Sequence, residues 1–424
     1  MAETIAVRQR VRGLLPRGKG LRMEIGSIYE LNPETLPKGE KAEKTGVRLT
    51  EIEKYRKSNV EYTMSGRAAI ALALRSIVKN RPGISKRCLL PVYMCDTVFF
   101  PFEWEGWEIH FYHIQKNLEA DEGELRRLVG QVRPGLLFIH AYYGVDTWKP
   151  MRSLLKEWKN HGICIMEDVT QSYYLEGAGE EADYVVGSLR KWYPLPDGGF
   201  VASKEPIAGE MAVSEKEFTE KRIGLLTEKW SYLYGKNGEK EKKAMKESYL
   251  KKNREMEEWL DNHRGIGGLS VESAGILAAV DEAGCRMKRS GNYYYLLERM
   301  KGKKQFWPIL PEKEAIKGKE PGRAGGEELK KGGDGAGTAP LYLAVYALDR
   351  DRLQRFLTEH NIYAPVLWPV GKENESCLTG DEKYIFGHML ALPMDQRYGR
   401  KEMEHMADIL DKAEKVLGGM ECSR

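Results

Sequence analysis

Apolar runs alternate with amphipathic segments through the first half of the chain. An Ala- and Leu-rich segment at 66–80 predicts a helix, and 151–162 predicts another that ends at Gly162. Short apolar runs are typical of strands that a sheet buries on both faces. Such runs, one of them alternating, occur at 87–93, 107–114, 135–144, 163–168, 182–189 and 198–203. Because strands separated by helices form right-handed crossovers, the pattern predicts an α/β fold with a mainly parallel sheet.

The second half of the chain is more charged and more helical. Residues 240–265 predict a helix that is solvated or faces a partner, and 270–300 continue the helical region. A small α/β unit is then expected from a strand, an Asp-capped helix, a second strand and an amphipathic helix. These lie at 339–348, 349–361, 362–370 and 400–417.

This organisation predicts three regions. We expect an N-terminal arm at 1–45, a large domain at 46–260, and an interdomain helix with a small C-terminal domain at 261–424. Residues 313–337 are dominated by Gly, Lys and Glu, which cannot bury enough apolar surface to order themselves. A flexible surface insertion is therefore predicted there.

Composition excludes several classes of function. The 67 basic and 63 acidic residues leave a net charge of +4, and runs of Lys are matched by runs of Glu, which argues against nucleic-acid binding. The six Cys are far apart, so neither a metal site nor a disulfide framework is indicated, and a reducing cytoplasm fits best. No stretch approaches 18 apolar residues, so no membrane span is expected.

An acid and a lysine stand out among the apolar strands. Asp168 ends one run, and in a parallel sheet the carboxyl ends of the strands face the ligand crevice. Lys191 comes shortly after a later run and is followed by Trp192 and Tyr193, surroundings that lower the pKa of an amine and suit Schiff-base formation. Pyridoxal phosphate needs both groups, because the acid keeps its ring nitrogen protonated. The simpler interpretations are a helix cap for Asp168 and a surface position for Lys191.

The start of the first helix could bind the phosphate of such a cofactor. Ser65, Gly66 and Arg67 lie where free N–H groups and the helix dipole favour an anion. Ser188 precedes Lys191 by three residues and could reach the same phosphate. A small-residue helix start is also a common packing device, so the order of these groups along the chain carries the prediction.

Several of these segments resemble the DegT/StrS-type aminotransferases, which are fold type I pyridoxal-phosphate enzymes known for sugar-nucleotide transamination. "MEDVTQS" is similar to the family's "EDxAQ" segment, and "KWYPLPDGG" to its lysine followed by Gly-Gly. "SGRAAI", "YYG" and "LALPMDQRYG" also correspond to family segments, so the resemblance spans about 60–418. It implies a large domain with a seven-stranded, mainly parallel sheet, a small C-terminal α/β domain and a homodimer.

The resemblance also implies roles for individual residues. Lys191 would form the Schiff base and shuttle the proton, and Asp168 would pair with the pyridinium nitrogen. Gln171 would lie close to the ring hydroxyl, and Ser188 with the turn at 65–67 would bind the phosphate. Tyr93, favoured over the nearby Cys95, would stack on the ring.

Two positions depart from the family pattern. The usual phosphate serine lies five residues before the lysine, where this chain has Val186, and Ser188 has the spacing of aspartate-aminotransferase-like enzymes instead. Arg67 replaces a threonine, so it could strengthen phosphate binding or turn away into an ion pair. Both departures put the substrate in question more than the cofactor.

Four further residues each have two interpretations. His140 could contact substrate or be a hydrogen-bonded core residue, and Arg190 could bind a substrate carboxylate or phosphate or form a structural salt bridge. Asn292 could reach a neighbouring subunit's site or lie on a core-packing helix face. Asp197 stands where the family has Glu and could only cap a turn.

The sequence thus predicts a cytoplasmic, homodimeric aminotransferase that uses pyridoxal 5′-phosphate and small-molecule substrates. The amino group would pass from an amino acid to an oxo acceptor, which could be a nucleotide-linked keto sugar. Two alternatives stay open. One is a lyase or another pyridoxal-phosphate reaction on the same fold, and the other is a non-catalytic descendant with a binding or regulatory role.

Overall fold

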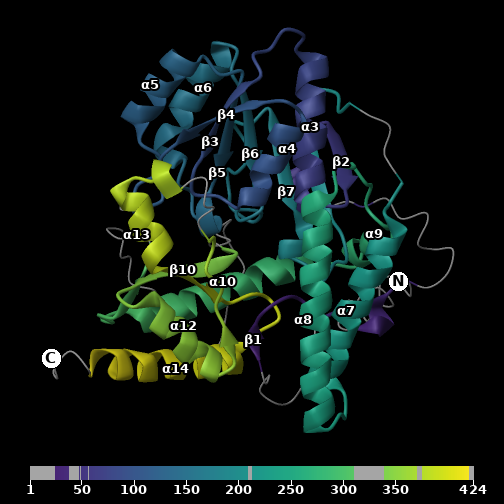
Figure 1. Ribbon diagram of the computed structural model, residues 1–424, viewed down its shortest axis with the longest axis vertical. Coiled ribbons are helices and arrows are strands. Elements are labelled where there is room, and N and C mark those ends of the chain that lie inside the picture. The colour runs from purple at the N-terminus through teal and green to yellow at the C-terminus, as the bar shows by residue number, and fades with distance from the viewer. Residues whose placement is uncertain are drawn as a thin grey trace, which may run out of the picture.

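The computed structural model describes residues 24–37, 47, 49–55, 57–208, 213–309, 339–369 and 375–419. The predicted insertion at 313–337 and most of the predicted N-terminal arm lie outside the described residues. Figure 1 shows a large α/β domain above a smaller one, with a long helical hairpin beside both.

A seven-stranded sheet forms the centre of the large domain, as expected. Its order is β2-β8-β7-β6-β5-β3-β4, and the five strands from β7 to β4 are parallel, whereas β8 is antiparallel to both of its neighbours. The six predicted strands are all present, and β2 was not predicted. The strands are β2 (Asn59–Thr63), β3 (Arg87–Pro91), β4 (Glu108–Tyr112), β5 (Leu136–His140), β6 (Cys164–Asp168), β7 (Tyr184–Ser188) and β8 (Gly199–Ser203).

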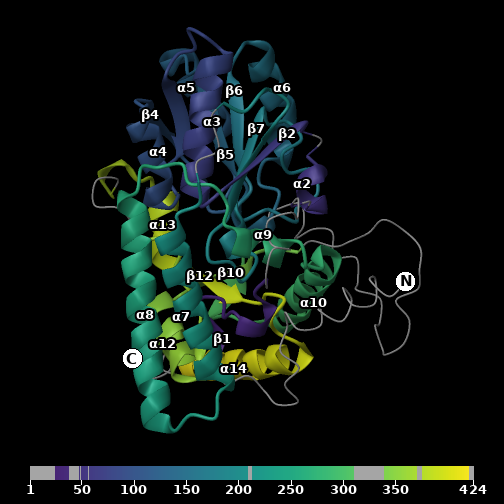
Figure 2. The ribbon, with the colours of Figure 1, turned by 90° about the vertical axis from the view of Figure 1, so that its right-hand side faces the viewer.

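Helices cover both faces of this sheet (Figure 2). Alternate residues of β6 belong to two different hydrophobic clusters. Met166 is in the cluster of Leu74 of α3 on one face, and Ile165 is in the cluster of Leu155 of α6 on the other. The continuous apolar strands noted in the sequence follow from this double burial. The helices of this domain are α2 (Thr50–Glu53), α3 (Gly66–Asn80), α4 (Phe99–Trp104), α5 (Glu122–Val132) and α6 (Arg152–Asn160).

The small domain is built on an antiparallel sheet of order β12-β10-β9. Asp349 caps its helix α12, as predicted, by accepting a hydrogen bond from the Arg352 N–H at 3.0 Å. The predicted strand at 362–370 is wrong, because only its first two residues are extended into a sheet. The elements are α9 (Val271–Leu277), α10 (Glu282–Met300), β9 (Phe306–Pro308), β10 (Tyr342–Ala347), α12 (Arg350–Glu359), β11 (Ile362–Tyr363), α13 (Gly380–His388), β12 (Met389–Pro393) and α14 (Arg400–Gly418).

Helices α7 (Lys216–Tyr234) and α8 (Glu239–Asn262) form the hairpin. It reaches from the large domain down beside the small one (Figures 1 and 2). As expected of a solvated helix, most of α8 is exposed or half-buried, but Tyr249, Met256 and Leu260 are buried in the core of the chain itself. Because charged residues separate these three in the sequence, the narrow apolar face of α8 was not recognised from the sequence pattern.

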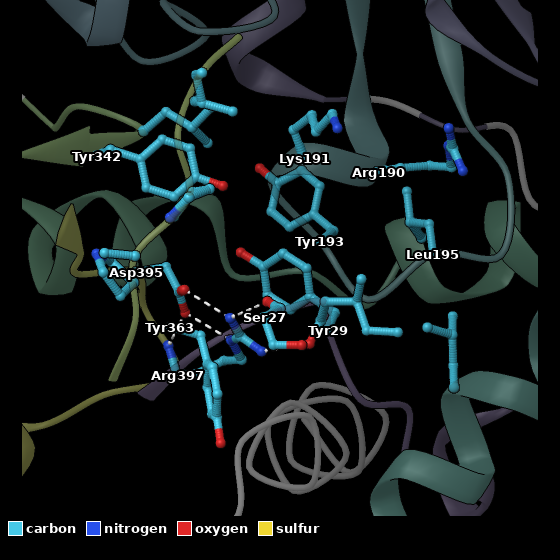
Figure 3. Close-up of a pocket in the computed structure, with 18 of the residues that line it drawn as sticks. Ser27, Tyr29, Arg190, Lys191, Tyr193, Leu195, Tyr342, Tyr363, Asp395 and Arg397 are labelled. Atoms are coloured by element: carbon cyan, nitrogen blue, oxygen red, sulfur yellow. Dashed lines mark hydrogen bonds and ion pairs between the residues drawn. The ribbon is translucent and has the colours of Figure 1, made fainter. Parts of the chain in front are cut away.

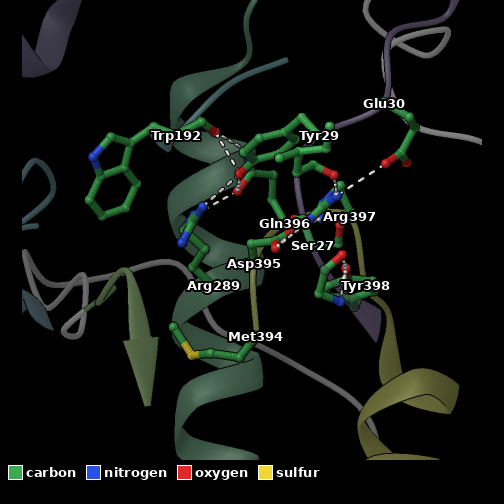
Figure 4. A network of polar contacts seen from close by, with 12 residues as sticks. Ser27, Tyr29, Glu30, Trp192, Arg289, Met394, Asp395, Gln396, Arg397 and Tyr398 are labelled. Carbon is green, nitrogen blue, oxygen red and sulfur yellow. Dashed lines mark hydrogen bonds and ion pairs between the residues drawn. The ribbon is translucent and has the colours of Figure 1, made fainter. Parts of the chain in front are cut away.

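The segment that begins at residue 24 is bound to the small domain. Its strand β1 (Ile25–Gly26) pairs in parallel with β11. Arg397 donates to the Ile28 carbonyl at 2.9 Å and to the Glu30 carboxylate at 3.1 Å, and Asp395 holds the same guanidinium at 2.8 Å (Figure 4). A buried cation thus fixes this segment through several hydrogen bonds.

Candidate active site

A cavity of about 250 Å³ lies at the carboxyl ends of β6 and β7. Asp168 is the last residue of β6 and Ser188 the last of β7. Lys191 follows in a short 3₁₀ turn, Leu189–Lys191, which carries its side chain over the same edge of the sheet. Because neighbouring parallel strands end at one edge, the apolar runs bring these groups together from positions more than twenty residues apart.

The cavity gathers seven of the eight residues that the sequence singled out for cofactor binding. Two more polar side chains at its wall, Glu257 and Asp261, come from α8 and were not predicted. No signal in the sequence connects them to the site, since their spacing of four residues indicates only a shared helix face. The seven predicted residues are Ser65, Gly66, Arg67, Asp168, Gln171, Ser188 and Lys191.

The start of α3 forms one end of the cavity. The Ser65 hydroxyl caps the helix by accepting from Ala68 N–H at 3.2 Å, and the first helical backbone bond runs from Ala69 N–H to the Ser65 carbonyl at 3.0 Å. The N–H groups of Gly66 and Arg67 precede that bond and are available to an anion. The Ser188 hydroxyl lies at the same cavity wall and has no hydrogen-bond partner among the described residues.

Two glycines allow this turn to lie against the sheet. A Cβ on Gly199 would come within 2.3 Å of the Ser65 carbonyl oxygen, and one on Gly66 within 3.3 Å of the Ser188 Cβ. Gly198 has a φ of +143°, which L side chains rarely adopt. The Gly-Gly pair in the sequence is therefore required for the close approach of two backbones.

Asp168 presents one oxygen to the cavity. Its Oδ1 accepts from Thr170 N–H at 2.8 Å, while the one described group that the structure pairs with Oδ2 is His140 Nδ1, at 3.7 Å. His140 donates from Nδ1 to the Asp168 carbonyl at 3.0 Å, and its buried Nε2 has no partner among the described residues. Burial lowers the pKa of His140, although Asp168 opposes that shift, so the ring is neutral near pH 7. The structure thus gives His140 a core position that also borders the cavity.

Lys191 lies between two cavities. It borders both of them, and its side chain is exposed. Desolvation by the protein around it lowers the pKa of Lys191, the cations Arg190 and Arg67 lower it further, and Glu257 acts in the opposite direction. A larger neutral fraction makes the amine a better nucleophile.

The Arg67 side chain is held by carboxylates of the helical hairpin. It forms an ion pair with Asp261 and lies 3.7 Å from Glu257, both on α8. Of the two possibilities left by the sequence, the structure shows the ion pair. Arg67 therefore connects the start of α3 to the hairpin and compensates the carboxylates that α8 brings to the cavity.

Tyr93 does not line the cavity, which corrects its predicted place against a cofactor ring. Its side chain is fully buried, with its hydroxyl 2.7 Å from that of Tyr143 and its ring against Tyr142 and Phe386. Cys95, the residue that was less favoured, lines the cavity instead. The chain leaves β3 in an irregular turn here, so strand alternation could not decide which side chain points inward.

The remaining sequence candidates have structural partners within the chain. Gln171 accepts from Tyr143 N–H at 2.8 Å through its carbonyl oxygen, which leaves its amide nitrogen at the cavity. Asn292 donates to the carbonyl of Asp395 at 3.2 Å and to two other carbonyls near it. Asp197 accepts from the Thr219 hydroxyl at 2.8 Å. The contacts of Asn292 and Asp197 thus lie within the chain, and neither residue lines the cavity.

A second cavity, of about 450 Å³, lies on the other side of Lys191. It separates the lysine turn and the helical hairpin from the small domain and the segment around Tyr29 (Figure 3). In Figure 3, Lys191 and Tyr193 lie across this space from Tyr363 and Asp395. Lys191 is thus accessible from two directions, one of which leads away from Asp168.

The described residues contain neither a cluster of His, Cys, Asp and Glu that could hold a metal ion nor a helix long and apolar enough to cross a membrane. No protein-family model matches the chain, and neither does any curated protein.

Solved structures match over nearly the whole chain. S. venezuelae DesV, in complex with a ketimine intermediate, is 15% identical with a TM-score of 0.58, over 97% of this chain and 95% of that one. Helicobacter pylori PseC, an aminotransferase involved in the biosynthesis of pseudoaminic acid, is 14% identical with a TM-score of 0.60, over 93% and 100%. NtdA from Bacillus subtilis with bound cofactor PMP is 12% identical with a TM-score of 0.56, over 96% and 92%. The chain therefore has the fold of these structures, the fold type I architecture of pyridoxal-phosphate enzymes.

Proposed function

We propose that this protein is a pyridoxal-phosphate-dependent aminotransferase that moves an amino group from an amino acid to an oxo acceptor. One observation carries the proposal: Lys191, Asp168 and the turn at Ser65 line the same cavity, so an amine, a carboxylate and an anion-binding helix start face one space. The similar structures support it, because PseC is described as an aminotransferase and NtdA holds PMP.

The residues present fit the cofactor. Gly66 at the start of α3 lines the cavity together with Ser65 and Ser188, and among the described residues the Ser188 hydroxyl has no hydrogen-bond partner. At the other end, the part of the chain that the structure describes brings no partner closer to Asp168 Oδ2 than His140, at 3.7 Å. Pyridoxal phosphate would supply an aldehyde for the lysine and a ring that accepts electrons. Ser65, Gly66 and Ser188 would hold its phosphate, and Asp168 its ring nitrogen.

Three side chains would then do the chemical work. The Lys191 amine, whose pKa is lowered, would hold the cofactor and, when free, would move a proton between substrate atoms. Asp168 would keep the ring nitrogen protonated, and the Thr170 N–H that donates to it at 2.8 Å fixes the orientation of its carboxylate. His140 is a positioning residue, since its ring lies against Asp168 and stays neutral.

The acceptor, the assembly and the cellular location are further parts of the proposal. We infer a nucleotide-linked keto sugar as acceptor, which the sugar aminotransferases among the similar structures support. A homodimer is supported by exposed apolar side chains on α9 and α10, namely Val271, Met287 and Tyr294 at 45%, 63% and 47% exposure. Light scattering on the purified protein tests the dimer. The evenly balanced charge and the separated Cys support a cytoplasmic location.

Absorbance spectroscopy tests the proposal directly. The purified chain mixed with pyridoxal phosphate should develop the visible band of a lysine-bound cofactor, and Lys191→Ala should not. Lys79→Ala, at an exposed position near the end of α3, is the matched control and should keep the band. An amino donor should then discharge the band of the wild-type protein.

The outcomes separate the alternatives. A band that is discharged without amine transfer, while elimination or racemisation proceeds, would favour another pyridoxal-phosphate reaction on this fold. A protein that stays colourless with added cofactor would reject every enzymatic proposal and favour a binding or regulatory role.

A further inference from the structure

We propose that Arg190 and Arg222 form an anion-binding subsite in the second cavity, which takes a carboxylate or phosphate group of the substrate. The inference rests on the proposed function, since it places the substrate beside Lys191. Both arginines line this cavity, and Arg190 directly precedes Lys191 in the chain. An anion held there would bring the rest of its molecule next to the lysine amine.

The two guanidinium groups are buried and only partly satisfied. The side chains of Arg190 and Arg222 are 9% and 6% exposed. The Nε atom of each is buried without a hydrogen-bond partner among the described residues. An unpaired buried donor is costly, and an ion that binds beside it is one of its known explanations.

Both arginines donate hydrogen bonds to the same carboxylate oxygen. Glu257 Oε1 accepts from Arg190 at 3.1 Å and from Arg222 at 3.3 Å. Among the described residues, the only other side chain bonded to Arg222 is the uncharged Asn253, at 2.8 Å. The second oxygen of Glu257 lies 3.7 Å from Arg67. Arg67 is already paired with Asp261. The buried cations Arg190 and Arg222 therefore share the carboxylate of Glu257.

The protonation equilibria agree with an excess of positive charge. Burial together with the neighbouring Arg190 lowers the pKa of Arg222 to about 10, with Glu257 and Asp197 acting in the opposite direction. Burial alone would raise the pKa of Glu257, but Arg190, Arg222 and Lys191 hold it far below the usual range. A second anion at this position would relieve the repulsion between the two arginines.

The size of the cavity suits a substrate. Its volume of about 450 Å³ exceeds the 250 Å³ on the Asp168 side, so the larger space is left for a molecule other than the cofactor. The anionic group has two possible sources, the carboxylate of an amino donor and the phosphate of a phosphorylated acceptor. Planar guanidinium groups bind either one through paired N–H donors.

Calorimetric titration of the cofactor-loaded full chain tests the subsite. The probes are glutarate and inorganic phosphate, each added at constant ionic strength set with chloride. We expect one of them to bind the wild-type protein, and Arg222→Gln to bind it about tenfold more weakly, the effect of one charge-assisted hydrogen bond. Arg299→Gln, a partly exposed arginine paired with Asp411, is the matched control and should bind as the wild type does.

A second variant keeps the test decisive if Arg222→Gln fails to fold. Glu257→Gln frees both guanidinium groups from their carboxylate and should tighten binding several-fold. A preference for glutarate would assign the subsite to the donor, and a preference for phosphate to the acceptor. Equal affinities in all variants, or no binding by the wild type, would overturn the proposal.

The same samples separate this proposal from the proposed function, because the visible band reports the cofactor and the heat of titration reports the anion. An intact band with unchanged anion affinity in Arg222→Gln would reject the subsite alone. A colourless wild-type protein that still binds glutarate through Arg222 would reject the enzyme and retain the subsite.

Discussion

Replacing Gly199 by alanine tests the geometry of the phosphate-binding turn. The new Cβ would lie 2.3 Å from the Ser65 carbonyl oxygen, 2.4 Å from the Ser65 carbonyl carbon and 2.8 Å from the Gly66 nitrogen, all of which are backbone atoms. Ordinary contact begins at 3.4 Å, so the closest approach must widen by the difference between 3.4 and 2.3 Å, or 1.1 Å. The start of α3 cannot stay in place beside β8.

The displacement should affect both stability and cofactor binding. Overpacking of this kind costs about 1–3 kcal/mol of unfolding free energy. Each hydrogen bond to a charged group is worth about 1.5–3 kcal/mol, so moving one N–H out of reach of the phosphate should weaken cofactor binding about ten- to a hundredfold.

Titration with pyridoxal phosphate, followed by visible absorbance, measures the affinity, and urea unfolding measures the stability. Gly130→Ala in α5 is the control, because that glycine is exposed and a Cβ there meets nothing within 4 Å. It should bind the cofactor normally and gain up to about 1 kcal/mol through its better helix propensity. A Gly199→Ala protein with wild-type cofactor affinity would refute this account of the turn.

Two further changes probe charges in the large domain. Burial raises the pKa of Glu167 from 4.5 to about 7. Between pH 4.5 and pH 7 the folded state therefore binds more protons than the unfolded state, so the free energy of unfolding falls as the pH rises through 7. Glu167→Gln removes this loss. Urea unfolding should show that the difference in unfolding free energy between the variant and the wild type shifts in favour of the variant by up to about 3 kcal/mol from pH 5 to pH 8. A difference that does not change with pH would contradict the burial argument. Arg67→Ala leaves Asp261 facing the phosphate position and should weaken cofactor binding about tenfold in the same absorbance titration, and adding Asp261→Asn should restore most of it. No recovery in the double variant would mean that Arg67 binds the phosphate itself.

Local signals were enough to predict the centre of the site. The Ala-rich helix at 66–80 has the predicted bounds, and its cap Ser65 was identified from the sequence. The apolar runs that end at Asp168 and Ser188 are strands with neighbouring ends, as their burial on both faces required. The whole path from Asp168 to Lys191 therefore followed from strand pattern and from the rule that strand ends face the ligand.

Other parts depended on tertiary contacts that no local pattern encodes. The segment 364–369 is apolar because it packs between the domains, and its prolines at 365 and 369 lack the N–H groups that a strand ladder needs. Its Trp368 lines the cavity beside Asp168, and its Leu367 carbonyl accepts from Tyr93. The ion pairs of α8 with Arg67 and Arg190 likewise join positions almost two hundred and about seventy residues apart.

The backbone next to Lys191 is held by residues from distant parts of the chain. The Trp192 carbonyl accepts hydrogen bonds from Tyr29, at 2.9 Å, and from Gln396 (Figure 4). These contacts span about 160 and 200 residues, so they close late in folding, after the sheet of the large domain has been able to form. During synthesis, the lysine turn can reach its final position only once residue 396 has left the ribosome. Cofactor capture by a nascent chain should therefore lag behind formation of the strands that carry Asp168 and Ser188.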